Sequence, residues 1–154
     1  MGTTSYVIAL GSNRRGRHGA PRDELAAALC ALGPAIVSPI LTTRPLGPSK
    51  RRFANAVAIV ESELDPPALM SRLKTIERAH GRRRGRRWDA RVIDLDIILW
   101  SDGPWATKGL TIPHPLFRER AFVLDPLVAI APGWRDPISG RTVRQLHARL
   151  HRPR

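Results

Sequence analysis

Cysteine, lysine and long apolar runs are all scarce in this 154-residue chain. Cys30 is the only cysteine, so no intramolecular disulfide can form, and its apolar neighbours in an expected helix predict a packed thiol. No apolar run approaches the ~20 residues needed to cross a membrane, and the first residues lack the basic and apolar segments of a secretory signal. We therefore expect a cytoplasmic protein that does not contact a membrane.

Negative charge is also scarce. The sequence has 13 acidic residues against 26 Lys and Arg, which gives a net charge of +13. Lys50, Lys74 and Lys108 are the only lysines, so arginine supplies nearly all of the excess. A basic surface favours anionic partners such as nucleic acid, nucleotide phosphates or acidic lipid, and composition alone does not choose among them.

The hydrophobic pattern predicts an alternation of strands and helices within one domain that spans residues 1–154. Pro39 indicates an edge strand or a bulge, and Asp65 followed by Pro66 is typical of a helix start. The expected order is strand 5–10, helix 22–32, strand 35–43, strand 53–64, helix 65–80 and strand 91–100, with a short helix near 142–149. This βαββαβ order predicts an α+β, ferredoxin-like antiparallel sheet with helices on one face and C-terminal additions.

The segment "VIDLDIIL" combines the character of a buried strand with two carboxylates. Residues two apart on a strand share a face, so Asp94 and Asp96 lie side by side while Ile93, Leu95 and Ile97 face the core. Paired carboxylates suit Mg²⁺, which is commonly held by one or two carboxylates together with substrate phosphates. A solvated strand face is an equally good interpretation of this pattern alone.

Six arginines, which suit phosphate oxygens, lie between residues 82 and 91 just before this strand. Together with metal-binding carboxylates they predict a polyphosphate ligand, whereas alone they would indicate a solvated or nucleic-acid-binding patch. The segment "GSNRRGRH" at 11–18 is not a Walker A loop, because it lacks the Lys-Ser/Thr ending.

Aromatic residues are few, and two of them stand in polar settings. Phe53 and Phe122 are candidates to sandwich a flat heterocycle, while Asn55 offers a donor and an acceptor to its edge. Ordinary core packing is the alternative for each phenylalanine. His114 lies between two prolines, a stiff setting that suits a phosphate contact, and a surface-loop histidine is its alternative.

Eight segments together carry a resemblance to a known family: "YVIALGSN", "TTRPLGP", "FANAV", "IERAHGRRR", "RWDARVIDLDIIL", "LTIPHP", "ERAFVLDPL" and "IAP". In this order they resemble the 6-hydroxymethyl-7,8-dihydropterin pyrophosphokinases of the folate pathway, nearly end to end. The resemblance implies a ferredoxin-like fold, and transfer of pyrophosphate from ATP to the pterin hydroxymethyl group with release of AMP.

The resemblance also implies roles for individual residues. Asp94 and Asp96 match ligands of two Mg²⁺ ions, and with Arg82 and Arg91 they form the expected catalytic set. The expected pterin contacts are Thr43, Arg44, Pro45, Leu46, Phe53, Asn55 and Phe122. The expected ATP contacts are Lys74, Glu77, Arg82, Trp88, Arg91, Ile97, Thr111, His114 and Arg120.

The chain departs from the family pattern in places that leave these metal ligands and aromatic residues intact. Asp89-Ala90 stands where many members have Gly-Pro, Lys50-Arg51-Arg52 is unusually basic, and Gly109 lacks an arginine that some members have. We expect a monomer that binds ATP and the pterin and does not bind nucleic acid. The competing hypothesis is a small basic RNA-binding protein that uses a ferredoxin-like sheet, although no aromatic-rich RNA-binding segment is present.

Overall fold

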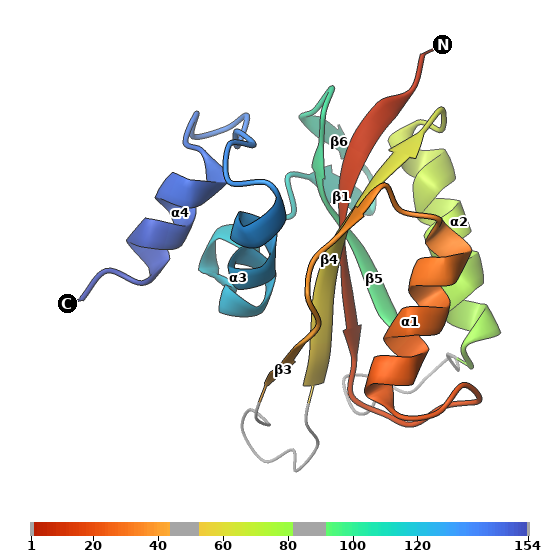
Figure 1. The fold of residues 1–154 in the computed structure, drawn as a ribbon. Coiled ribbons are helices and arrows are strands. Elements are labelled where there is room, and N and C mark those ends of the chain that lie inside the picture. The colour runs from red at the N-terminus through yellow and green to blue at the C-terminus, as the bar shows by residue number, and fades with distance from the viewer. Residues whose placement is uncertain (1, 44–52, 82–91, 154) are drawn as a thin grey trace.

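The computed structural model describes residues 2–43, 53–81 and 92–153 and is built around a five-stranded antiparallel sheet (Figure 1). The strand order is β2-β4-β1-β5, and β3 also pairs with β4. The strands are β1 (Thr4–Ser12), β2 (Ile36–Val37), β3 (Leu41–Thr43), β4 (Phe53–Ser62) and β5 (Asp94–Trp100). The helices are α1 (Pro21–Leu32), α2 (Pro66–Ala79), α3 (Ala121–Ile130) and α4 (Val143–Leu150), with a 3₁₀ turn at Phe117–Glu119.

The order of elements confirms the ferredoxin-like βαββαβ prediction, with one strand divided in two. The segment 35–43 forms β2 and β3, which both pair with β4 and are separated around Pro39. Ser38 bridges the interruption, because its N–H donates to the Val57 carbonyl and its Oγ accepts from the Val57 N–H, both at 2.9 Å. The proline thus marks an irregular edge, as the sequence indicates.

The two helices of the βαββαβ unit lie on one face of the sheet, as predicted, and the C-terminal helices cover the other face. Helices α1 and α2 pack on one face through an aliphatic cluster, and α3 and α4 pack on the other (Figure 1). The sequence did not predict helix α3, because Pro126 lies inside it. We refer to these as the α1/α2 face, whose cluster includes Leu25, Leu69, Leu73, Leu95 and Ile97, and the α3/α4 face, whose cluster includes Val57, Ile98, Phe117, Leu124 and Leu146.

Local signals start and end the helices of the α1/α2 face. The Asp65 carboxylate accepts a hydrogen bond from the Ala68 N–H at 3.0 Å, which confirms the predicted helix start. Helix α1 ends at Gly33, whose φ of 62° is the left-handed conformation that glycine adopts without strain. Cys30 is exposed, not packed, because Leu25, Ala28 and Leu32 form the buried stripe of α1 and Cys30 points away from it.

A hairpin that the sequence did not predict follows β5. It consists of β6 (Trp105–Thr107) and β7 (Leu110–Ile112), which form a separate two-stranded sheet. Trp105 joins it to the central sheet, since its ring meets the edge of Trp100 at a centroid distance of 5.8 Å. Among the described residues, no helix has the length and apolar character that would span a membrane.

Candidate active site

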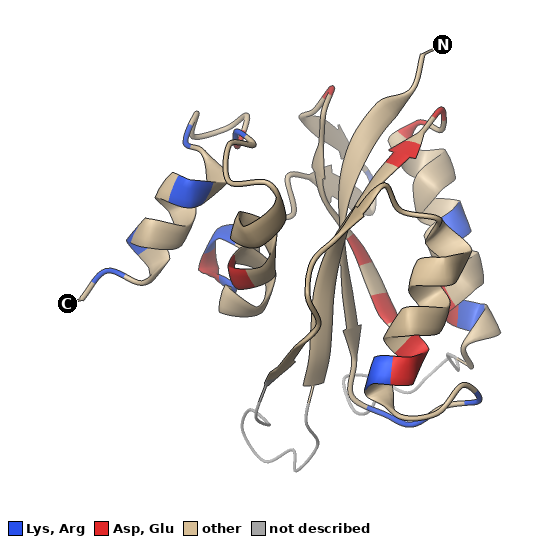
Figure 2. Ribbon diagram, viewed as in Figure 1, with Lys and Arg blue, Asp and Glu red and all other residues tan. Residues whose placement is uncertain are grey.

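The two aspartates of β5 project from the α3/α4 face of the sheet, where they form acidic bands on the strand (Figure 2). Both side chains are half-buried, while Leu95 and Ile97 between and after them pack into the α1/α2 cluster. In the register of β1 with β5, Asp94 lies opposite Gly11 and Asp96 opposite Ala9. The alternation of side chains along β5 therefore places the carboxylates on the face opposite the α1/α2 cluster, as the strand pattern predicts.

Gly11 lies between two polar side chains in the sheet. It pairs with Asp94 on one side and with Asn55 of β4 on the other, so a row of three residues crosses β4, β1 and β5. A Cβ atom at Gly11 would come 3.2 Å from the Asn55 Oδ1 atom. The missing side chain therefore lets the Asn55 amide lie close against the β1 main chain, in the same row as Asp94.

The sequence analysis did not predict this role of Gly11, because it ends the first strand at residue 10. The structure instead continues β1 to Ser12. A signal was nevertheless present, since Val7, Ala9 and Gly11 share a face and decrease in size toward the end of the strand. Along this face the sheet changes from aliphatic packing to an open polar end.

A β-bulge marks that change on β5. The register with β1 shifts between Val7 and Ile8, and Ile98 and Leu99 both belong to the α3/α4 cluster. A bulge places an extra residue on one strand and so brings neighbouring side chains to one face. As a result, the end of β5 beside Val7 is densely packed, and the end of β5 beside Gly11 carries the carboxylates.

His114 lies close enough to both Asp94 and Arg120 to interact with them electrostatically. The His114 N–H donates to the Ile98 carbonyl at 2.9 Å, which fixes the residue against β5. Burial lowers the pKa of His114, and the Arg120 guanidinium lowers it further, whereas Asp94 acts in the opposite direction. His114 Nδ1 accepts from the Leu116 N–H at 3.2 Å, so in the neutral ring the proton is on Nε2, which can donate to an anion.

Three of the expected pterin contacts lie on the same side of the sheet. Phe53 and Asn55 alternate with buried alanines on β4 and share the α3/α4 face with Val57. Phe122 extends from α3 and packs against the cluster of that face, with the Arg120 guanidinium 5.5 Å from its ring centroid. Thr43 pairs with Phe53 in the register, while Arg44, Pro45 and Leu46 lie outside the described residues.

The expected ATP contacts are less closely gathered. Lys74 and Glu77 belong to α2, which covers the opposite face, and the Glu77 carboxylate accepts from the Leu95 N–H at 2.8 Å. The Ile97 side chain is buried in the α1/α2 cluster, and Thr111 is exposed on β7. Arg82, Trp88 and Arg91 lie outside the described residues. The structure thus brings His114 close to both Asp94 and Arg120. It places Lys74 and the Glu77 and Ile97 side chains on the α1/α2 side of the sheet.

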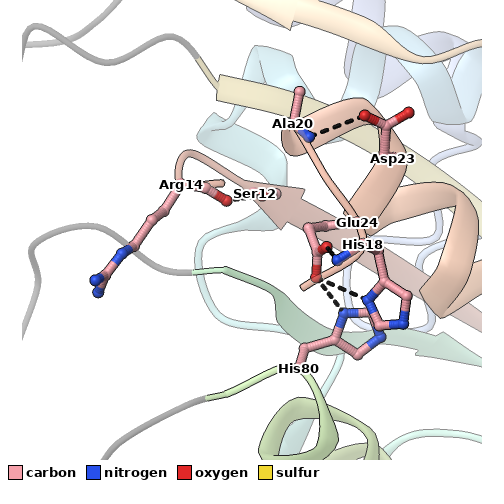
Figure 3. Close-up of polar contacts among 7 residues, drawn as sticks. All are labelled: Ser12, Arg14, His18, Ala20, Asp23, Glu24 and His80. Carbon is pink, nitrogen blue, oxygen red and sulfur yellow. Dashed lines mark hydrogen bonds and ion pairs between the residues drawn. The ribbon is translucent and has the colours of Figure 1, made fainter. Parts of the chain in front are cut away.

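A second polar cluster anchors the loop after β1 (Figure 3). Glu24 is fully buried, and its Oε1 lies 3.1 Å from His18 Nδ1 and 2.8 Å from His80 Nδ1, while Oε2 accepts from the His18 N–H. Burial raises the pKa of the Glu24 carboxyl, but the hydrogen bonds from His80 and His18 outweigh burial and hold it below its ordinary value. This cluster, which the sequence did not reveal, ties the loop to the end of α2, directly before residue 82.

Gly16 belongs to the same anchored loop. A Cβ atom there would lie 2.5 Å from Val92 Cγ1 and 2.8 Å from Glu24 Oε1. Real Cβ atoms do not approach other atoms so closely, so any other residue at position 16 would have to displace Val92 or the Glu24 carboxylate. The loop and the entry to the carboxylate strand are therefore packed together.

Comparison with protein families identifies residues 7–132 as matching the model of 7,8-dihydro-6-hydroxymethylpterin-pyrophosphokinase. Curated relatives named 2-amino-4-hydroxy-6-hydroxymethyldihydropteridine pyrophosphokinase match over different lengths. The Pseudomonas aeruginosa protein is 39% identical over 92% of this chain and 88% of its own length, and that of Haemophilus influenzae is 42% identical over 83% and 81%. The Synechocystis relative is 42% identical over 68% of this chain, which spans about half (53%) of that protein.

Solved structures with the same fold are larger than this chain. A wild-type Plasmodium falciparum HPPK-DHPS chain aligns with a TM-score of 0.71 at 15% identity, over 96% of this chain and 41% of its own. A second, with pteroate, aligns with a TM-score of 0.68 at 15% identity, over 96% of this chain and 42% of its own. At this identity the likeness concerns the fold alone.

Proposed function

The chain belongs to the 7,8-dihydro-6-hydroxymethylpterin-pyrophosphokinase family, and we propose that it transfers pyrophosphate from ATP to 6-hydroxymethyl-7,8-dihydropterin in folate biosynthesis. The observation that carries this proposal is the row Asn55-Gly11-Asp94 across three strands, with Asp96 beside it on the same face. The Asn55 amide can form hydrogen bonds with the edge of a heterocycle. The carboxylates of Asp94 and Asp96 can bind the cation that accompanies a nucleotide. Family membership also favours this activity over the RNA-binding hypothesis.

The residues of this face fit magnesium. Asp94 and Asp96 offer oxygen ligands two positions apart on one strand, and the residues opposite them, Gly11 and Ala9, are small. We propose that both carboxylates hold the two Mg²⁺ ions implied by the family resemblance. When bound, Mg²⁺ would supply positive charge next to the phosphates and polarise their oxygens.

The proposed reaction is a displacement at the β-phosphorus of ATP. The oxygen of the pterin hydroxymethyl group forms a bond to that phosphorus, and the bond from it to the oxygen bridging to the α-phosphorus breaks. AMP leaves with that oxygen, and the hydroxyl proton passes to solvent. In phosphoryl transfer, positioning and charge stabilisation supply most of the catalysis, so the roles of the chain are to align the two substrates and to exclude water.

We propose that His114 and Arg120 contact the phosphates of ATP. His114, kept neutral by burial and Arg120, can donate its Nε2 proton to a phosphate oxygen, and the guanidinium of Arg120 offers forked donors. We propose that Arg82 and Arg91 add phosphate contacts and that Trp88 helps to close the site. Phe53 and Phe122 would stack on the pterin, with Asn55 at its edge.

For the remaining expected contacts, the structure limits what we propose. The Glu77 carboxylate supports β5 through the Leu95 N–H, so its proposed effect on ATP is through the position of that strand. Ile97 can contribute only its main chain, because its side chain is in the core. Lys74 and Thr111 are exposed and free to meet a nucleotide that extends beyond the sheet. Thr43, Arg44, Pro45 and Leu46 are proposed to complete the pterin site.

The test is to incubate the purified chain with ATP, Mg²⁺ and 6-hydroxymethyl-7,8-dihydropterin and to measure AMP and the pterin diphosphate. We expect both products in equal amounts, and no AMP when the pterin is omitted. Asp96→Asn should lower turnover by about 100- to 1,000-fold, the range expected for losing a preorganised charge-stabilising group. Asp102→Asn, which changes an exposed aspartate just after β5, is the matched control and should retain activity.

Absence of pterin-dependent AMP from folded protein would refute the proposed activity. Equal activity of the Asp96→Asn and Asp102→Asn variants would instead refute the assigned site. We also propose that residues 1–154 act as one pyrophosphokinase domain, as a monomer and in the cytoplasm where ATP is available. Light scattering of the purified chain tests the oligomeric state.

A further inference from the structure

Three metal-ligand side chains converge between α3 and α4, the two helices that lie on the opposite side of the sheet from α1 and α2 (Figure 1). His147 Nε2 lies 2.9 Å from Asp125 Oδ1, and His151 Nε2 lies 2.7 Å from the same oxygen. His147 belongs to α4, His151 caps its end, and Asp125 belongs to α3. None of the three is used by the proposed pyrophosphoryl transfer.

The spacing of the two histidines is that of a helical metal chelate. Residues four apart on a helix share a face, and the two imidazole rings lie with their centroids 4.6 Å apart. A pair of histidines at this spacing is a known zinc-binding arrangement, and catalytic and other open zinc sites add one carboxylate from elsewhere in the chain. Asp125 supplies that third ligand here.

The distances suit a small cation after a modest adjustment. Zinc is bound at about 2.0–2.2 Å by imidazole nitrogen and carboxylate oxygen, so its ligand atoms lie roughly 3.4 Å apart in a tetrahedral site. The present nitrogen-to-oxygen distances of 2.7 and 2.9 Å would need to lengthen by about 0.5–0.7 Å. The side chains of Asp125, His147 and His151 are 38%, 32% and 47% exposed, so they can rotate by this amount without disturbing the core.

We propose that Asp125, His147 and His151 form a binding site for a divalent transition-metal ion of the zinc type. Two imidazoles and one carboxylate favour zinc, cobalt or nickel over magnesium, which prefers oxygen ligands alone. Three ligands leave a coordination position for water, because the site is open to solvent. The bound ion would fasten α4 to α3, the helix that also carries Phe122.

The experiment is a calorimetric titration of the full chain with ZnCl₂ at about pH 7.5, where imidazole is neutral. Excess Mg²⁺ is present throughout, to occupy the oxygen ligands of Asp94 and Asp96. We expect one saturable zinc site. His147→Ala, His151→Ala and Asp125→Asn should each weaken zinc binding by at least about 100-fold, since the loss of even an outer-shell partner costs about 10- to 100-fold.

His18→Gln is the matched control, because it removes a histidine from the other histidine–carboxylate cluster of the described residues, His18-Glu24-His80. It should leave the zinc affinity unchanged. Titration with CoCl₂ adds a spectroscopic readout, since the visible absorption of bound cobalt reports nitrogen ligands and should vanish in His151→Ala. Circular dichroism confirms that each variant is folded.

Failure of the wild-type chain to bind zinc saturably would overturn the proposal. Equal zinc affinity in the wild type and in folded His151→Ala and Asp125→Asn variants would also overturn it. A loss of binding in His18→Gln alone would overturn it in favour of the other cluster. Because zinc binding is measured without ATP or pterin, these outcomes are independent of the proposed pyrophosphokinase activity.

Discussion

The two faces of the central sheet differ in what their side chains do. On the α1/α2 face, aliphatic residues of β1, β4 and β5 pack against Leu25, Leu69 and Leu73. On the α3/α4 face, the same strands carry aliphatic residues only along part of their length and then present Asn55, Asp94 and Asp96. One face is therefore mainly structural, while the other combines a core with a polar end.

The difference follows from the two-residue period of a strand. Each strand that crosses the site gives alternate residues to each face, so one face can vary in chemistry while the other holds the strand in place. Substitutions on the α1/α2 face should therefore change stability, and substitutions at the polar end of the α3/α4 face should change activity.

The largest effect is expected from Leu73→Ala on the α1/α2 face. Leu73 is fully buried, and replacing such a leucine by alanine costs about 2–5 kcal/mol through lost transfer energy and the remaining cavity. Denaturant unfolding measures the loss. The matched control is Leu64→Ala, whose side chain is 37% exposed and should change the free energy of unfolding by less than about 0.5 kcal/mol.

The turnover number of the folded fraction of Leu73→Ala should equal that of the wild type. A variant that remained as stable as the wild type but lost turnover would show that the α1/α2 face takes part in the chemistry. That result would contradict the separation of the two faces.

Gly11→Val, at the polar end of the α3/α4 face, should lower activity more than stability. Its Cβ would lie 3.2 Å from Asn55 Oδ1, and its methyl groups would occupy the space between Asn55 and Asp94. We expect kcat/KM to fall by about 100-fold, the effect of misplacing reacting groups by about 1 Å. Stability should fall less than in Leu73→Ala, because valine is well suited to a strand and only the Asn55 side chain has to shift.

The matched control is Gly133→Val, at a position where a Cβ atom would meet nothing within 4 Å. It should retain both activity and stability. If Gly11→Val kept full activity, the row Asn55-Gly11-Asp94 would not be the substrate site. If it failed to fold, Gly11→Ala would provide the smaller version of the same obstruction.

The sequence predicted the alternation of β5 and the order of elements, because both depend on local periodicity. Asp94 and Asp96 could be assigned to one face from spacing alone, and their partners in the family resemblance gave that face a chemistry. The register in which the strands pair could not be predicted from local periodicity. Nothing local indicates that Gly11 pairs with both Asn55 and Asp94, which are 44 and 83 residues distant in the sequence.

Features set by distant partners were missed for the same reason. Glu24 and His80 are 56 residues apart, and no periodicity relates them. Helix α3 was missed for another reason, since Pro126 breaks the usual helical signal although the flanking Leu124 and Leu127 hold the helix against the sheet. Packing against the α3/α4 face overrides local propensity there.

Glu24→Gln tests whether the buried polar cluster supports the structural face. Removing the carboxylate charge weakens the hydrogen bonds from His18 and His80, so we expect a loss of about 1–3 kcal/mol at neutral pH. Because the folded pKa of Glu24 is lowered, its stabilisation is complete above the unfolded pKa of about 4.3 and disappears as the pH falls through the lower folded value. Denaturant unfolding across this range should show the two proteins converging in acid.

The matched control is Glu61→Gln, since Glu61 is exposed on β4. Its unfolding free energy should follow that of the wild type at every pH. A constant difference between Glu24→Gln and wild type down to low pH would show that the charge of Glu24 is not the source of the stabilisation.

The smallest effect is expected in the C-terminal layer of the α3/α4 face, from Thr142→Ala. Thr142 caps α4, because its Oγ1 accepts from the Gln145 N–H at 3.2 Å while Gln145 Oε1 accepts from the Thr142 N–H at 2.9 Å. Loss of such a cap costs about 1 kcal/mol, and Thr142→Ser, which retains the hydroxyl, should restore most of it. The cap lies away from Asp94 and Asp96, so kcat should remain unchanged in both variants, as measured by AMP release. A fall in kcat that the serine variant corrects would instead mean that α4 helps to position the polar end of this face. The part of the α3/α4 face that serves only as a core would then be smaller than proposed here.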